Sequence, residues 1–270
     1  MSSDPRTWIA TLRRSHDRLD KMVRSRTPEQ LRAQSYDTDW NVAQVLSHLG
    51  SGAEISLMRL PEALGDGEPV SRDAVPAVWS VWNAKSPDEQ AADGLAVDEK
   101  HVQALEELSD EQLASVDLDF FGLMRLDAVG MVRVRLGEHA LHTWDVEVVS
   151  DPDATVQQEA VELLIDNVQS LAPRFGKPAG EPFSVRITTT DPARDYLVTS
   201  RESVTMTDWP GEAGPVDADG AALGEVPHVQ MPAEALLRLA YGRLDPEHTP
   251  AAVSGDVDAL NKLRAIFPGF

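Results

Sequence analysis

The spacing of apolar residues changes once along the 270-residue chain, and the change separates two regions. Up to about residue 150, apolar residues recur three or four positions apart with charges between them, which is typical of amphipathic helices. Asp151-Pro152-Asp153 then interrupts any helix, and beyond it the period falls to two in several short stretches. The sequence therefore predicts two domains, a helical one at 1–150 and an α/β one at 151–270.

Four long helical patterns in the first region predict an antiparallel four-helix bundle. They cover residues 5–23, 40–61, 87–113 and 126–149, with short apolar stretches at 77–84 and 118–126. Asp4 and Pro5 would begin the first helix, and Asp39 would cap the second. The second region predicts helices at 156–172, 232–244 and 257–266 and strands at 183–187, 196–199 and 204–207. The expected fold class is therefore α plus α+β.

The charge of the chain restricts its partners. It has 45 acidic and 24 basic side chains, which gives a formal net charge of −21 at pH 7. Such a charge repels phosphate backbones and anionic membrane surfaces, so we expect no nucleic-acid partner and no membrane partner. The N-terminal residues lack the apolar core of a signal peptide, and no run of eighteen apolar residues occurs. These features favour a cytoplasmic protein.

The absence of cysteine restricts the chemistry. It excludes disulfides, cysteine-ligated zinc, iron–sulfur clusters and a cysteine nucleophile. Metal or nucleophilic chemistry must therefore use His, Asp, Glu, Ser or a group borrowed from a cofactor. The seven histidines are the first candidates, although a lone histidine is more often a surface or core residue than a ligand.

Glu138 and His142 lie four residues apart in a strongly helical segment. Residues at this spacing share one helix face, so they can ligate one ion or form an ordinary surface pair. The segment is not the His-Glu-x-x-His motif of zinc proteases, because His139 and His142 are only three apart. It also lacks the Glu-x-x-His motif of di-iron bundles, which would need a glutamate in place of His139.

His48 lies close to the apolar face of its predicted helix, three residues after Val45 and seven before Ile55. An inward-facing histidine needs a polar partner. If it faced Glu138 and His142, the three side chains would form a two-histidine, one-carboxylate site with an open position, as catalytic zinc requires. The same donors also suit iron, so the spacing does not select the metal.

Three stretches resemble motifs of one family. Residues 40–49 read Trp-x-Val-x-x-Val-Leu-x-His-Leu, residues 138–145 read Glu-x-x-x-His-x-Trp-Asp, and the tail contains 236–244 and Phe267-Pro268-Gly269-Phe270. In this order they resemble the mycothiol-dependent maleylpyruvate isomerase family. The resemblance implies a DinB-like metal-binding four-helix bundle followed by a smaller α/β domain that is similar to sterol carrier proteins.

The resemblance also implies a site and an activity. His48, Glu138 and His142 would bind zinc or another divalent metal, whose open position would face the sulfur of mycothiol, the low-molecular-weight thiol of actinobacteria. The enzyme would be an isomerase or an S-transferase acting on a small maleylpyruvate-like electrophile. Arg238 or Arg243 would be catalytic and contact substrate carboxylates, as a bidentate guanidinium can. We expect a monomer or a homodimer.

Two neighbours of the predicted ligands leave alternatives open. Asp145, three residues after His142, would either accept a hydrogen bond from that ligand or lie on the helix surface. Gln44 occupies a position where we expect many relatives to have an acidic residue. If that residue supports the helix that carries His48, its absence leaves open which group does so here. The alternative function is a non-enzymatic small-molecule-binding module with a structural metal or none.

Overall fold

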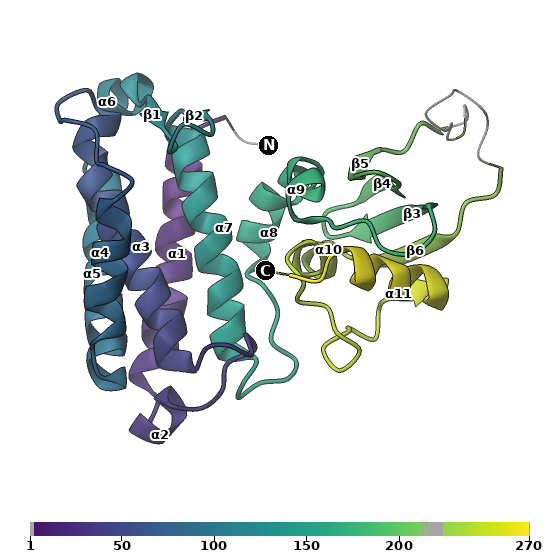
Figure 1. Cartoon of the computed structure of the whole chain (residues 1–270), viewed down its shortest axis with the longest axis horizontal. Helices are drawn as coiled ribbons and strands as arrows, with labels where there is room; N and C mark the ends of the chain where they lie inside the picture. Colours follow the sequence, from purple (N-terminus) through teal and green to yellow (C-terminus); the bar gives the residue numbers. More distant parts are fainter. Residues whose placement is uncertain (1–2, 212–213, 215–223, 270) are drawn as a thin grey trace. The chain divides into compact units, whose positions relative to one another are not determined.

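The chain divides between Ala160 and Val161 into two compact units, each described here by itself. The computed structural model describes residues 3–211, 214 and 224–269 (Figure 1). The first unit is a helical bundle and the second is an α/β domain, which confirms the predicted fold class. No helix among the described residues is both long and apolar enough to cross a lipid bilayer.

Four long helices form the first unit (Figure 1). They are α1 (Pro5–Arg24), α3 (Val42–Ala63), α5 (Pro87–Glu106) and α7 (Ala128–Glu147). Asp4 caps α1 and Pro5 begins it, as predicted. The predicted cap of α3 was wrong, because Asn41 and not Asp39 caps the helix. The Asn41 side chain accepts a hydrogen bond from the Gln44 backbone N–H, and the Gln44 side chain accepts one from the Asn41 backbone N–H. This reciprocal pair is a capping box.

Two predicted helices are divided in the structure. The 87–113 pattern forms α5 and then α6 (Asp110–Ser115), because Ser109 and Gln112 make a capping box that begins a new helix. The 156–172 pattern forms α8 (Gln158–Leu164), the 3₁₀ turn η1 (Ile165–Asn167) and α9 (Val168–Phe175). Shorter elements complete the first unit: α2 (Pro28–Leu31), α4 (Ala74–Asn83), β1 (Leu118–Asp119) and β2 (Arg125–Leu126).

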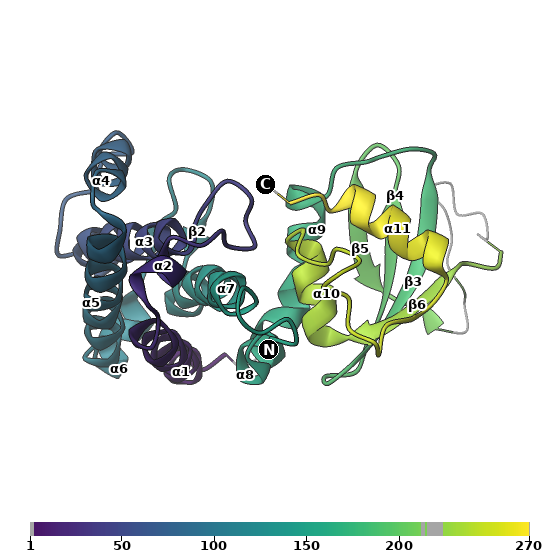
Figure 2. The ribbon, with the colours of Figure 1, turned by 90° about the horizontal axis from the view of Figure 1, so that it is seen from below.

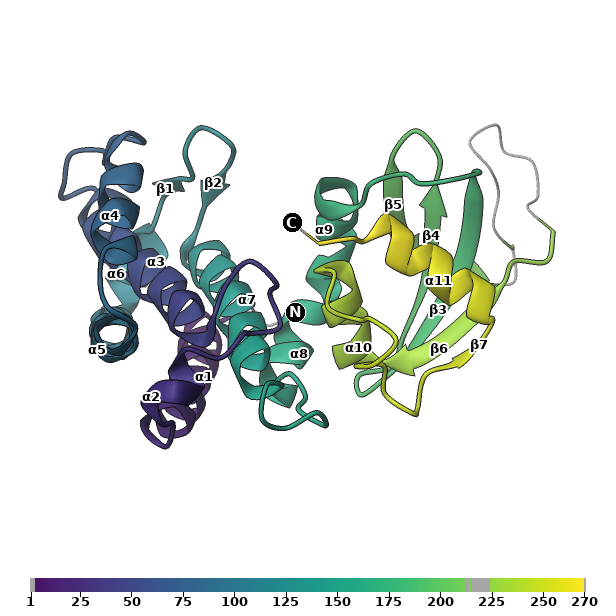
Figure 3. The ribbon, with the colours of Figure 1, turned by 60° about the horizontal axis from the view of Figure 1, so that its bottom comes forward.

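A mixed five-stranded sheet forms the second unit, in the order β5-β4-β3-β6-β7. The strands are β3 (Phe183–Thr190), β4 (Arg194–Ser200), β5 (Val204–Asp208), β6 (His228–Pro232) and β7 (Ser254–Gly255). The first three match the predicted strands, whereas β6, which pairs parallel with β3, and β7 were missed. Helices α10 (Ala233–Ala240) and α11 (Val257–Ile266) lie over one face of the sheet (Figures 2 and 3).

Two glycines let α3 approach α5 closely. A Cβ atom added to Gly50 would lie 2.7 Å from the Gly94 Cα, and one added to Gly94 would lie 2.7 Å from the backbone oxygen of Leu46. Both distances are below normal van der Waals contact, and the opposing atoms are backbone atoms that cannot move independently. This close approach holds α3, the helix that carries His48, against the rest of the bundle.

We predict that Gly94→Ala destabilises the bundle by about 1–3 kcal/mol, the usual cost of overpacking a core. The sign is informative, because the same change at an unconstrained helix position stabilises by roughly 0.5–1 kcal/mol. Urea unfolding followed by far-UV circular dichroism measures the difference. An unchanged or increased free energy of unfolding would show that α3 and α5 do not approach as closely as described.

Candidate metal centre

His48 on α3 meets Glu138 and His142 on α7. One nitrogen of each histidine and one carboxylate oxygen lie within 4.8 Å of one another. The His48 Nε2 atom is 3.0 Å from the Glu138 Oε2 atom, although 90 residues separate the two in sequence. The His142 Nε2 atom is 3.6 Å from the same oxygen. The structure therefore brings together the three residues predicted as metal ligands.

This group is open to solvent on one side. The His48 and Glu138 side chains are 34% and 41% exposed, whereas the His142 side chain is 10% exposed. The His48 and His142 rings lie with their centroids 4.7 Å apart at an interplanar angle of 66°. A small molecule can therefore approach the donor atoms from the side of His48 and Glu138, as a catalytic metal site requires.

The protonation states suit a metal. Burial lowers the pKa of His48 and outweighs its hydrogen bond to Glu138, so this imidazole is neutral at pH 7. Burial opposes ionisation of Glu138, but contacts with His142 and His48 hold the pKa of its carboxyl far below the usual range. The group therefore presents a carboxylate and a neutral imidazole, the charge states in which Glu and His bind a metal.

Asp145 fixes the orientation of His142. Its Oδ2 atom lies 2.7 Å from the His142 Nδ1 atom, and the residue is fully buried. With a metal bound, the Asp145 carboxylate would hold the His142 proton on Nδ1 and so leave the Nε2 lone pair for the ion. The hydrogen bond that sequence reasoning offered as one alternative for Asp145 is thus present.

Arg238 and Arg243 lie in the second unit and are both buried. The Arg238 guanidinium pairs with Glu234 at 2.7 Å and also donates to the backbone oxygens of Arg243 and His248. The Arg243 side chain donates to the backbone oxygen of Tyr241. Both side chains hold the segment after α10 in place, and contact of either one with a substrate stays a prediction.

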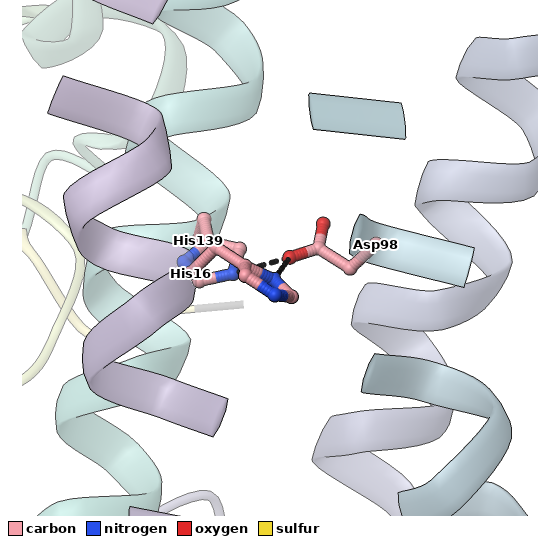
Figure 4. Close-up of side chains that lie close together, drawn as sticks. All are labelled: His16, Asp98 and His139. Carbon is pink, nitrogen blue, oxygen red and sulfur yellow. Dashed lines mark hydrogen bonds and ion pairs between the residues drawn. The ribbon is translucent and has the colours of Figure 1, made fainter. Parts of the chain in front are cut away.

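A second group, which sequence reasoning did not assemble, lies inside the bundle (Figure 4). His16 on α1 and His139 on α7 both contact the Oδ2 atom of Asp98 on α5, at 2.7 and 2.9 Å. All three residues are buried, and their donor atoms could also hold a metal ion. Arg135 donates to the other Asp98 oxygen at 2.5 Å and to the backbone oxygen of Leu49 on α3 at 2.8 Å. The Asp98 network therefore joins all four helices.

The carboxylates of the Asp98 network already have positively charged or hydrogen-bonding partners. The His16 Nε2 atom lies 3.0 Å from Glu99, so both nitrogens of this ring face carboxylates and each needs a proton. Burial opposes that charge, but Asp98 and Glu99 raise the pKa of His16. Because Arg135 already pairs with Asp98 and Arg13 with Glu99, a divalent cation would add positive charge to a buried site that has its counter-charges. The open group is therefore the better metal candidate.

A cavity of about 490 Å³ borders the Asp98 network at His16 and Glu99 and does not include the open group. Each of its four lining carboxylates lies near an arginine: Asp20 near Arg24, Asp88 near Arg32, and both Asp17 and Glu99 near Arg13. Because these carboxylates already have arginine partners, the volume of the cavity alone does not assign a ligand to it.

We predict that protonated His16 stabilises the fold in a pH-dependent way. Because its folded-state pKa is raised, the stabilisation is full below the unfolded-state value of about 6.5 and is lost as pH rises through the higher folded-state pKa. Urea unfolding of the wild type and His16→Gln between pH 5 and 9 should show their stability difference shrinking with rising pH. His228→Gln, at an exposed position, is the control, and a difference independent of pH would contradict the prediction.

Comparison with known proteins gives one consistent result. Sequence models of the mycothiol maleylpyruvate isomerase N-terminal domain and of the MDMPI C-terminal domain match residues 12–147 and 168–262. The crystal structures of a mycothiol-dependent maleylpyruvate isomerase and of its histidine-to-alanine mutant share the fold with a TM-score of 0.65, at 15% and 14% identity, over 94% of this chain and 93% of theirs. No curated protein sequence matches the chain. The chain belongs to the mycothiol maleylpyruvate isomerase family.

Proposed function

We propose that this protein is a cytoplasmic metal-dependent enzyme that uses mycothiol as a cofactor to isomerise a small electrophile or to transfer the thiol to it. The observation that supports this most directly is that donor atoms of His48, Glu138 and His142 lie within 4.8 Å of one another. Membership of the family suggests mycothiol as the cofactor, because the enzyme in the two similar crystal structures is mycothiol-dependent.

The residues fit a tetrahedral divalent metal. Bond lengths of roughly 2.0–2.2 Å place neighbouring zinc ligands about 3.3 Å apart, and the two histidine nitrogens lie 3.0 and 3.6 Å from the Glu138 oxygen. Asp145 orients one of the histidines, as acceptors behind metal ligands commonly do. The exposed side of the group leaves a fourth position for a small molecule.

The residues of the site would have separate roles. His48, Glu138 and His142 would hold the metal, and Asp145 would keep the His142 lone pair directed at it. When bound, a divalent metal favours the thiolate form of a thiol whose pKa is otherwise about 8.5. Because the chain has no cysteine, the reacting sulfur must belong to the cofactor, and the protein cannot trap that cofactor as a mixed disulfide.

We predict one zinc or other divalent ion per chain in the protein purified without chelators. His48→Ala should lose most of it, because two remaining donors bind a divalent ion weakly. Elemental analysis by mass spectrometry gives the stoichiometry. His248→Ala, a histidine of the second unit that pairs with Asp245, serves as the matched control. A metal-free wild type after zinc loading, or equal zinc in His48→Ala, would refute the metal site.

We also predict that turnover of maleylpyruvate or of a related unsaturated keto acid requires mycothiol. The loss of substrate absorbance measures the rate, and Ellman's reagent measures free thiol without background because the chain has no cysteine. Constant thiol during turnover indicates isomerisation, and its one-for-one consumption indicates S-transfer. Metal binding with no thiol-dependent rate on any such electrophile would favour the non-enzymatic binding module.

A further inference from the structure

The two histidines of the candidate metal centre are held in different ways. His142 is nearly buried and its Nδ1 atom contacts the buried carboxylate of Asp145. His48 is about one-third exposed, and within the described part of the chain its only side-chain hydrogen bond is the one from Nε2 to Glu138. A metal ligand without a second hydrogen bond can rotate about its side-chain torsions, which weakens the metal site unless another group restricts the ring.

The residue one turn before His48 does not supply that restriction. Gln44 lies on the same helix face, four positions earlier, where its side chain could reach the histidine. Its amide oxygen instead accepts the backbone N–H of Asn41 at 2.9 Å, in the capping box that begins α3. The side chain of Gln44 is therefore engaged at the end of the helix.

Trp40 covers the His48 ring. The two ring centroids are 4.9 Å apart with an interplanar angle of 34°, and the Trp40 ring lies 6.0 Å from that of His142. The 4.9 Å separation is within the range of favourable aromatic contacts. Trp40 packs against the apolar core of the bundle, and its backbone oxygen accepts hydrogen bonds from Ser35 and Gln34. The indole is thus a fixed surface against which His48 rests.

We infer that Trp40 is a positioning residue for the metal centre, and this inference rests on the proposed function. Its indole face limits the rotation of the His48 ring, so that Nε2 points at the volume shared with Glu138 and His142. The contact with the Trp40 ring thus orients His48, as the hydrogen bond with the Asp145 carboxylate orients His142. The strength of metal binding should therefore depend on the aromatic face at position 40 more than on the volume filled there.

Titration with Co²⁺, whose visible absorption reports its coordination, tests this on the full chain. Trp40→Leu keeps an apolar side chain in the core but removes the aromatic face, and it should weaken Co²⁺ binding about tenfold, as loss of groups that orient ligands typically does. Trp40→Phe keeps a face and should bind within about twofold of the wild type. Trp79→Leu, an exposed tryptophan on α4, should bind as the wild type does.

Each outcome has one meaning when thermal melts accompany the titrations. Unchanged Co²⁺ affinity in Trp40→Leu overturns the inference and leaves the proposed metal function intact. Equal losses in Trp40→Leu and Trp40→Phe that follow their loss of melting temperature also overturn it, because they indicate loss of packing alone. If neither the wild type nor any variant binds Co²⁺, or if His48→Ala binds it as tightly, both the inference and the proposed function fail.

Discussion

The bundle depends on one buried carboxylate. Asp98 lies in the apolar interior, where an unpaired charge would cost several kcal/mol, and it receives hydrogen bonds from His16, His139 and Arg135. Arg135 extends the Asp98 network to the backbone of Leu49. These contacts fix the positions of the four helices along their axes. Sliding α5 or α7 by a turn would separate Asp98 from Arg135, sliding α1 would remove His16 from Asp98, and sliding α3 would break the hydrogen bond from Arg135 to Leu49. Burial of apolar residues alone would tolerate such a shift far better.

The register set by Asp98 determines the candidate metal centre. His139 of the Asp98 network is adjacent in sequence to Glu138, and Leu49 is adjacent to His48. The same contacts that tie α7 to α5 and α3 therefore place Glu138 opposite His48, where the two come within 3.0 Å. The Asp98 network inside the bundle and the open group at its surface thus lie next to each other on the same helices. The first holds the helices in the register that the second needs.

Sequence periodicity predicted the elements better than their contacts. The positions of the four long helices and three strands follow from local apolar spacing, and the sequence contained an unused signal for the break after α5, the Ser-x-x-Gln capping box at Ser109. Asp98 was a second unused signal, since it falls in the apolar stripe of Leu95, Val102 and Leu105. Its partners could not be deduced, because they lie 82 and 41 residues away. Strands β6 and β7 were missed for the same reason, as pairing with distant strands defines them.

The coordination of a sulfur atom by the bound metal distinguishes a thiol-binding site from other metal sites. X-ray absorption at the zinc edge of the loaded protein should show only nitrogen and oxygen neighbours, in keeping with His48, Glu138 and His142. Addition of mycothiol should introduce one sulfur neighbour at about 2.3 Å, and the absence of cysteine from the chain assigns that thiolate to the cofactor. A spectrum that gains no sulfur neighbour with saturating mycothiol would contradict the central claim that this site binds a thiol through its metal.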